Sequence, residues 1–264
     1  MLVESANGLV KVLLAPACPV CRSTLERPFA GPVCQTCLDG IPTLTPPWCV
    51  CCSEPLRHAG TSGPFCNRCT ARRPSFTYAR SVGRYEGSLR EIIHAFKYGR
   101  CRAIAEPLAR ALTEAGRDVL AAADAVIPVP IHPLRAVTRG FNQADDLARH
   151  LGTPVWNVLR RARRGPPQAS LPADSRATNV RGAFAVRPTW RHRGRRRLGL
   201  PDLNNSAVVV IDDVMTTGAT LDACSQALLE AGARRVSVLT VARSVSSRPV
   251  QPRQQPRLSN ARRR

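Results

Sequence analysis

The sequence predicts an α/β protein in which a parallel sheet flanked by helices follows a small, cysteine-rich, zinc-binding domain. Two observations predict this fold class. Short runs of consecutive apolar residues, the pattern of strands buried on both faces, alternate with helical stretches over residues 78–243. Before that region, eight of the 11 cysteines form four Cys-x-x-Cys pairs. The βα order of the later region is typical of a parallel sheet.

The chain divides into four parts. They are an N-terminal segment, 1–17; a double zinc ribbon, 18–75; an α/β domain, 78–243, with a basic insert at about 187–203; and a basic tail, 244–264. The tail is rich in Pro, Gln, Ser and Arg and is predicted to be disordered. The α/β part has roughly 165 residues, which is long enough to bury a core.

The cysteine pairs predict two structural zinc sites. Twelve residues separate the first pair from the second, and thirteen separate the third from the fourth, which suits knuckles that close tetrahedral Cys₄ sites. The ligands expected for the two Zn²⁺ ions are Cys18, Cys21, Cys34, Cys37, Cys49, Cys52, Cys66 and Cys69. Two alternatives stay open: the pairs could interleave between the metals, and Cys51 could replace a neighbouring ligand. The segment has few aliphatic residues and needs metal to fold.

The cysteines also bear on location. Disulfides need an oxidising compartment, but Glu4 and Lys11 interrupt the one short apolar stretch near the N-terminus, so no export signal is predicted. No apolar run long enough to span a bilayer occurs, so no membrane insertion is expected. Four Cys-x-x-Cys motifs in a loop-rich segment also argue against a thioredoxin-like role. A cytoplasmic protein is therefore expected.

The first strand, loop and helix that bear on function lie in the middle of the chain. Residues 124–130 (DAVIPVP) predict an apolar strand, and residues 130–142 follow as a basic loop. Asn142 is a good N-cap for the next helix, and Asp145 and Asp146 suit its first turn because acidic side chains are favoured there. Ligands bind at the carboxyl ends of strands in open α/β sheets, so this loop is placed at such an end.

A second unit of this kind is the most informative stretch of the chain. Residues 208–211 (VVVI) predict a buried strand, and Asp212 and Asp213 follow at its carboxyl end. Residues 214–219 form a loop of small residues, and helical spacing of apolar residues begins at Leu221. The loop therefore lies between a buried strand and a helix N-terminus.

This loop has the composition of a phosphate site. Unpaired N–H groups at a helix start favour a phosphate, and Gly218 and Ala219 let the backbone approach it closely. The hydroxyls of Thr216, Thr217 and Thr220 add donors. The adjacent carboxylates can accept hydrogen bonds from sugar hydroxyls or lie near a divalent metal, so a ribose 5-phosphate unit is predicted. The alternative is that the acids form a solvated strand end and the threonines only cap the helix.

The stretch 208–220, VVVIDDVMTTGAT, resembles the 5-phosphoribosyl 1-pyrophosphate (PRPP) motif of type I phosphoribosyltransferases. The resemblance implies the fold of that family and a Mg²⁺-dependent transfer of a 5-phosphoribosyl group from PRPP to an acceptor. It also implies that the two acids contact the ribose hydroxyls. The residues implied for binding the ribose and the 5-phosphate are Asp212, Asp213, Val214, Met215, Thr216, Thr217, Gly218, Ala219 and Thr220.

Other motifs are similar to those of the ComF family of phosphoribosyltransferase-like proteins. Ile-Pro-Val-Pro at 127–130, a near relative of Val-Pro-Val-Pro, is followed by Arg-Gly-Phe-Asn-Gln at 139–143. Single matching positions are Tyr85, Gly87, Lys97, Gly99, Gln168, Arg176, Asn179 and Phe184. The resemblance covers nearly everything from Cys18 to Arg243. It implies single-stranded DNA as a partner, and a weaker option makes the zinc ribbons a docking module for a helicase-like protein.

Cationic and amide side chains are expected on the pyrophosphate side of the site. Arg139 follows a strand-terminal loop, which aims it at the same crevice, and with Asp212 and Asp213 it completes the predicted catalytic set. Lys97 is expected to contact phosphate or to form a structural ion pair. The set expected on the pyrophosphate or flexible-loop side is Lys97, Arg135, Arg139, Gln143, Gln168 and Arg176. Residues 160–176 are expected to fold over the substrate.

The net charge of +21 comes from 37 arginines and two lysines against 18 acidic residues. No acidic residue occurs between Asp174 and Asp202 or after Glu230. The basic insert and the basic tail can therefore neutralise nucleic-acid phosphates, with salt-dependent and sequence-independent affinity. The alternative is a solvated basic surface, or an arginine bias that reflects coding composition alone.

Two functions follow as predictions. In the first, which is the preferred prediction, the protein is a Mg²⁺-dependent phosphoribosyltransferase that acts on an unidentified acceptor. In the second it is a non-catalytic, single-stranded-DNA-binding competence factor that keeps the PRPP-type pocket.

Overall fold

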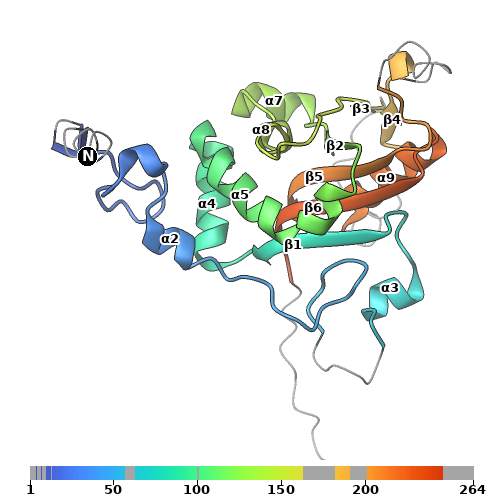
Figure 1. Cartoon of the computed structure of the whole chain (residues 1–264), viewed down its shortest axis with the longest axis horizontal. Helices are drawn as coiled ribbons and strands as arrows, with labels where there is room; N and C mark the ends of the chain where they lie inside the picture. The colour runs from blue at the N-terminus through green and yellow to red at the C-terminus, as the bar shows by residue number, and fades with distance from the viewer. Residues whose placement is uncertain are drawn as a thin grey trace, which may run out of the picture.

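The structure is a computed structural model that describes residues 4, 7, 10–12, 14–56, 63–99, 101–162, 182–190 and 201–245. Its centre is a four-stranded sheet with the order β1-β6-β5-β2, in which every neighbouring pair is parallel. The strands are β1 (Tyr78–Arg84), β2 (Ala125–Pro128), β5 (Ala207–Met215) and β6 (Arg235–Arg243). They lie side by side in Figure 1, with β1 at one edge and β2 at the other. The predicted α/β class with a parallel sheet is confirmed.

Side chains that alternate along the central strand face two separate cores. Val208 and Val210 pack into the core that contains α9 (Ala219–Glu230), whereas Val209 and Ile211 pack into the core on the opposite face. This alternation follows from the two-residue period of a strand. Because a hydrophobic core covers each face of the sheet, the sequence of this strand is a continuous run of apolar residues.

The second core is formed by two helices whose apolar residues follow helical spacing. In α4 (Gly87–Tyr98) and α5 (Ala105–Ala115) the buried positions recur at i, i+3, i+4 and i+7. They are Leu89, Ile92, Ile93 and Phe96 in α4, and Ala105, Leu108, Ala109 and Leu112 in α5. These helices cover one face of the sheet and leave the carboxyl ends of its strands open.

The remaining elements are short. They are η1 (Pro28–Ala30), α2 (Gln35–Asp39), α3 (Asn67–Ala71), η2 (Arg102–Ile104), α6 (Arg117–Ala121), α7 (Pro133–Arg139), α8 (Gln143–Arg149), β3 (Leu159–Arg161), β4 (Phe184–Val186) and η4 (Pro188–Trp190). Strands β3 and β4 form a separate antiparallel pair. Across the described ranges, none of the helices has the length and apolar character needed to cross a membrane.

The expectation of a basic loop over 130–142 is wrong in part, because α7 occupies its centre. His132 caps the helix with its side chain, which accepts a hydrogen bond from the Leu134 amide, and Pro133 starts it. Gly140 ends it in a left-handed conformation with φ of 79°. These capping signals are local, and they outweigh the lack of an amphipathic pattern in so short a segment.

The central strand is longer than predicted. It runs through Asp212 and Asp213 to Met215, because the ladder with β6 continues as Asp212 pairs with Thr240 and Met215 with Arg243. The helix that follows begins at Ala219, two residues before the predicted start. The acids therefore belong to the last residues of the strand.

Several predicted features lie outside the described residues. They include Gln168, Arg176 and Asn179, residues 191–200 of the basic insert and residues 246–264 of the tail. Arg160 is described, and it lies in strand β3, so the predicted flexible loop begins later than residue 160.

Candidate functional site

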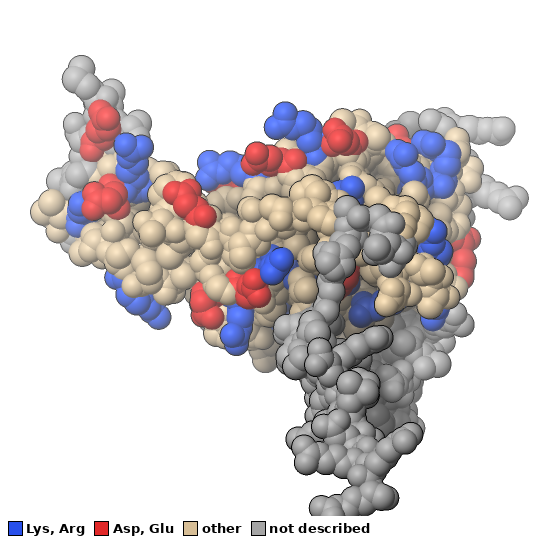
Figure 2. All heavy atoms as spheres, turned by 90° about the horizontal axis from the view of Figure 1, so that it is seen from below, with Lys and Arg blue, Asp and Glu red and all other residues tan. Residues whose placement is uncertain are grey.

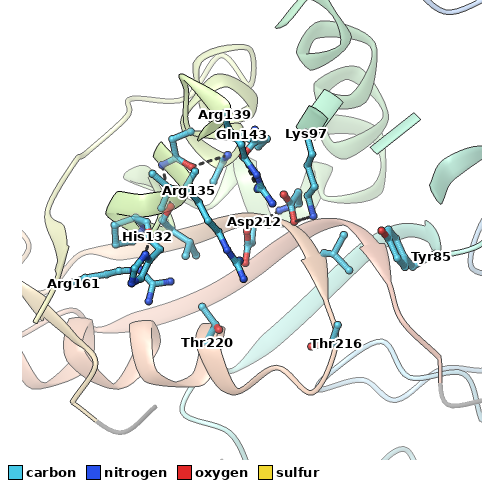
Figure 3. Close-up of a pocket in the computed structure, with 17 residues that line it drawn as sticks. Tyr85, Lys97, His132, Arg135, Arg139, Gln143, Arg161, Asp212, Thr216 and Thr220 are labelled. Carbon is cyan, nitrogen blue, oxygen red and sulfur yellow. Dashed lines mark hydrogen bonds and ion pairs between the residues drawn. The ribbon is translucent and has the colours of Figure 1, made fainter. Parts of the chain in front are cut away.

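A cavity of about 310 Å³ lies at the carboxyl end of the sheet. Figure 3 shows that its walls come from segments far apart in the sequence: α4, the β2–α7 connection, α7, α8, β3 and β5. Among the residues predicted for the site, Lys97, Arg135, Arg139, Gln143, Asp212, Asp213, Val214, Thr216 and Thr220 line it. The fold thus brings the predicted acidic and cationic groups and part of the phosphate loop into one pocket, whereas Met215, Thr217, Gly218 and Ala219 are not among the residues that line it.

Two carboxylates form the floor of the pocket. The amide of Asp213 donates to Asp212 Oδ1 at 2.9 Å, and Lys97 Nζ lies 2.8 Å from Asp213 Oδ1. The Lys97 and Asp213 side chains are only 14% and 13% exposed. The sequence predicts either a phosphate contact or an ion pair for Lys97. In the structure Lys97 forms an ion pair with Asp213 within the pocket.

The two acids differ in their environments. Burial raises the pKa of Asp212 from 3.8 to about 7, and repulsion from Asp213 adds to this effect. The amide of Asp213, the Lys97 ammonium and the Arg161 guanidinium oppose the rise. Asp212 is therefore a carboxyl group that changes its charge near neutral pH.

This pKa predicts a pH dependence of ligand affinity. The ionised Asp212 only accepts hydrogen bonds, as a sugar hydroxyl requires, and this form replaces the protonated form as pH rises through about 7. We expect the affinity for ribose 5-phosphate, measured by calorimetry at constant ionic strength, to rise about tenfold from pH 6 to pH 8. The Asp212→Asn variant should keep only the smaller step that comes from the phosphate itself. Parallel curves for the two proteins would contradict this role.

The carbonyl groups of the phosphate loop are all bound by other groups of the protein. The carbonyls of Met215, Thr216, Thr217 and Gly218 each accept a hydrogen bond, from the Ser244 amide, Arg243, Arg68 and the Asp222 amide, respectively. In contrast, the amides of Thr216, Thr217 and Gly218 donate no hydrogen bond to any residue that the structure describes. Such a loop has free donors for an anion.

Gly218 allows this loop to turn into the helix. It is the N-cap of α9 and has φ of 81°, in the left-handed region. A Cβ at this position would also lie 2.8 Å from the Met215 methyl carbon. That methyl group ends a flexible side chain that can shift, so the left-handed conformation is what requires glycine here.

A cationic wall faces the acids across the pocket. Arg139 donates to Gln143 Oε1 at 3.1 Å and to the Tyr98 hydroxyl at 3.3 Å. Gln143 is 2% exposed, and its Nε2 has no hydrogen-bond partner in the described part of the chain. In Figure 3, Arg135 reaches toward Asp212. A buried amide without an acceptor is costly, so a ligand oxygen at this wall would relieve it.

Arg161 is a pocket residue that was not predicted from the sequence. It donates to the Pro130 carbonyl at 3.1 Å, and its guanidinium lies 4.8 Å from the centre of the Phe184 ring. Burial lowers its pKa, and Asp212 lies close enough to oppose that shift. No local signal distinguishes it, because it is one of four arginines among residues 160–164.

The cysteines form the two quartets expected for zinc. Within each quartet the four Sγ atoms lie within 4.8 Å of one another, and the quartets combine the first pair with the second and the third with the fourth. The Sγ atoms of Cys21 and Cys34 are 3.5 Å apart, and those of Cys52 and Cys66 are 3.6 Å apart. A tetrahedral Zn²⁺ with Zn–S bonds of about 2.3 Å needs Sγ separations of about 3.8 Å, so the quartets fit this ion. The interleaved arrangement is excluded, and Cys51 is buried outside the quartets.

The two zinc ribbons pack on different faces of the α/β domain. Cys18 and Cys37 belong to the core that contains α4 and α5, whereas Cys52 and Cys69 belong to the core that contains α9. Figure 1 shows the first ribbon, which includes α2, next to α4, and the second ribbon, which includes α3, on the side of β1. The ribbons thus extend both hydrophobic cores.

Most of the net positive charge lies outside the described residues. Those residues contain 22 of the 39 Lys and Arg residues but 17 of the 18 acidic ones, which leaves +5 of the net charge of +21. On the face shown in Figure 2, cationic and anionic side chains are interspersed over the described surface. Electrostatic binding of a nucleic acid would therefore depend mainly on the basic insert and the tail.

Two family comparisons cover the domains of the chain. Residues 9–72 match the family described as a double zinc ribbon domain. Residues 137–256 match the family described as a phosphoribosyl transferase domain. The second match includes the acids, the phosphate loop and Arg139 of the pocket.

Curated relatives match nearly the whole chain. Competence protein F of Haemophilus influenzae is 31% identical over 237 residues, which are 86% of this chain and 96% of that protein. DNA utilization protein YhgH of Salmonella typhimurium is 31% identical over 239 residues, 86% of this chain and 97% of that protein. Adenine phosphoribosyltransferase of Rhodococcus jostii is 32% identical over 140 residues, 53% of this chain and 64% of that protein.

Proposed function

Because this chain belongs to the competence protein F (ComF) family, with a double zinc ribbon and a phosphoribosyltransferase domain, we propose that it binds PRPP and transfers its 5-phosphoribosyl group to an acceptor. One observation carries the proposal. A carboxylate pair and a cationic wall line a single pocket, and a loop with free amides borders it through Thr216 and Thr220. These three surfaces complement the hydroxyls, the 5-phosphate and the pyrophosphate of one ligand.

Each wall has a role in the proposed reaction. The carboxylates of Asp212 and Asp213 accept hydrogen bonds from the ribose hydroxyls and stabilise the positive charge that develops at the ribose as its bond to pyrophosphate breaks. Arg139 and Gln143 bind the departing pyrophosphate, and the Thr216–Thr220 loop fixes the 5-phosphate. The acceptor then attacks ribose C1 on the opposite face.

Mg²⁺ is part of this proposal, and the pocket fits it. Mg²⁺ in proteins is commonly held by one or two carboxylates together with substrate phosphates. Asp212 and Asp213 are the two carboxylates that line the pocket, and they would hold the ion near the ribose hydroxyls and the pyrophosphate. When bound, Mg²⁺ supplies positive charge that neutralises the leaving group.

We also propose a cytoplasmic location. The cysteine quartets support it, because eight free thiols poised to bind metal need a reducing compartment.

The names of the relatives favour a second candidate function. Two of them are a competence protein and a DNA utilization protein, and the insert (187–203) and tail (244–264) carry +11 of the net charge of +21. In this candidate the pocket binds PRPP or a related phosphoribosyl ligand without turnover, and the basic segments bind single-stranded DNA.

One experiment on the wild-type protein tests both candidates. We expect calorimetry with PRPP and MgCl₂ to give a dissociation constant on the order of micromolar. We then expect pyrophosphate release with at least one acceptor from a panel of nucleobases. Failure to bind PRPP would overturn the first candidate, and failure to bind both PRPP and ribose 5-phosphate would overturn both candidates. Binding without release, combined with single-stranded-DNA affinity that falls steeply with salt, would replace the first candidate by the second.

A further inference from the structure

The second zinc ribbon holds the phosphate loop from the side opposite the pocket. Arg243, at the end of β6, is 1% exposed and donates from Nε and Nη2 to Glu54 Oε2 of the ribbon, at 3.1 and 2.6 Å. Its Nη1 donates to the Thr216 carbonyl at 2.8 Å. A buried guanidinium thus joins the ribbon to the loop, and Glu54 satisfies its charge.

Two more contacts join the same pair of segments. Arg68, in α3 of the ribbon, donates from Nη1 to the Thr217 carbonyl at 3.1 Å. Asp222, in the first turn of α9, accepts from the Ser75 amide at 2.6 Å and lies 3.7 Å from Arg72. The loop and the helix that follows it are therefore fixed by the ribbon at three points.

Glu54 and Arg68, the two ribbon residues that anchor the loop, lie within or beside the Cys-x-x-Cys pairs of the second quartet. Glu54 follows Cys52 by two residues, and its carbonyl accepts from the Cys49 amide at 2.8 Å. Arg68 lies between Cys66 and Cys69. The metal that shapes the knuckles therefore also sets the positions of both anchors.

We propose that the second ribbon is a positioning element of the phosphate site, in which Glu54, Arg243 and Arg68 hold the loop carbonyls so that the loop amides stay directed at the ligand. This inference rests on the proposed binding of a phosphoribosyl ligand. Holding the carbonyls before the ligand arrives lowers the cost of ordering the loop on binding. By linkage, the metal quartet of this ribbon and the ligand pocket stabilise each other.

The first ribbon supplies a natural contrast. Its Lys11–Glu26 pair, 2.8 Å apart, is solvent-exposed, and in the part of the chain that the structure describes neither residue contacts the phosphate loop. Glu26→Gln is therefore a matched control for Glu54→Gln. Within the second ribbon, Arg73 lies over the Phe65 ring at 3.5 Å, so Arg73→Met is a charge-matched control for Arg68→Met.

The test measures PRPP affinity by calorimetry in the full-length, zinc-loaded protein. We expect Arg68→Met to weaken binding about fivefold and Glu54→Gln about tenfold, with Arg73→Met and Glu26→Gln unchanged. Arg68→Lys keeps a donor for the Thr217 carbonyl and should restore most of the loss. Arg68 is exposed, so we expect Arg68→Met to fold normally, and its unfolding temperature checks this expectation.

Zinc release gives an independent readout. At equilibrium with a competing chelator, saturation of the wild-type protein with PRPP should raise the affinity for one of two zinc equivalents about tenfold and leave the other unchanged, and Glu54→Gln should reduce this effect. If wild-type protein does not bind PRPP, the proposed function is overturned together with this inference. If it binds PRPP, but Arg68→Met and Glu54→Gln bind as tightly as their controls, only the inference is overturned.

Discussion

The double variant Asp212→Asn/Asp213→Asn is expected to bind PRPP at least about 100-fold more weakly than the wild type. Each carboxylate is predicted to accept a charge-assisted hydrogen bond from a ribose hydroxyl, and each such bond is worth about 1.5–3 kcal/mol. The variant also leaves Lys97 without its partner at 2.8 Å. Calorimetry with PRPP and MgCl₂ measures the loss, and pyrophosphate release should fall with it.

The single variants should separate binding from stability. Asp213→Asn breaks the largely buried Lys97 ion pair, so it should lower both affinity and the unfolding temperature. Asp212→Asn should lower affinity but raise the unfolding temperature, because it removes a carboxylate that the folded protein holds at a cost. A double variant that binds PRPP like the wild type would show that the acids are only a strand end.

The stability effect of Asp212 has a defined pH window. In the unfolded chain this group ionises near 3.8, and in the folded protein near 7. Folding is therefore progressively disfavoured as pH rises from about 4 to about 7, and the penalty stays constant above that range. The gain in unfolding temperature for Asp212→Asn should accordingly be small at pH 4 and largest above pH 7.

The sequence was most informative where neighbouring residues act together. The run from Val208 to Thr220 contains its strand, its acids and its phosphate loop within one segment, so local patterning predicted their order. The eight cysteines were predictable for the same reason, because ligand spacing reflects the size of a zinc knuckle. Both features depend on short-range geometry that the chain itself sets.

Contacts between distant segments could not be predicted. Arg243 and Glu54 are separated by 189 positions, and Arg68 and Thr217 by 149. Nothing in the local sequence distinguishes Arg243 or Arg161 from the other 35 arginines. Lys97 was recognised as unusual, but its pairing with Asp213 depends on how α4 packs on the sheet.

The predicted boundaries of helices and strands were wrong where helix capping or strand pairing determines them. Residues 133–139 have no apolar period, yet the His132 and Gly140 caps stabilise α7 there. The polar residues Asp212 and Asp213 interrupt the apolar run, yet pairing with β6 extends β5 past them. The pattern of hydrophobic residues alone reveals neither the capping of α7 nor the pairing that extends β5.

Replacing one cysteine in each quartet is expected to have the largest effect on stability. Cys37→Ser and Cys69→Ser should each reduce zinc content from about two ions per chain to about one, since each quartet has the four ligands for one ion. Structural zinc contributes about 10–16 kcal/mol in small domains of this kind, more than a ribbon with few aliphatic residues could replace. Both cysteines also lie in the hydrophobic cores, so each variant should expose part of a core.

The comparison of the two cysteine variants also tests how the ribbons divide their roles. Elemental analysis and thermal unfolding should show similar losses of zinc and stability, because each ribbon packs on one face of the same sheet. Ligand affinity should fall mainly in Cys69→Ser, since Arg68 of the second ribbon contacts the Thr217 carbonyl and Glu54 of the same ribbon holds Arg243, which contacts the Thr216 carbonyl. Zinc-free protein that becomes more stable on oxidation would instead indicate disulfides, and it would remove zinc from this account of the fold.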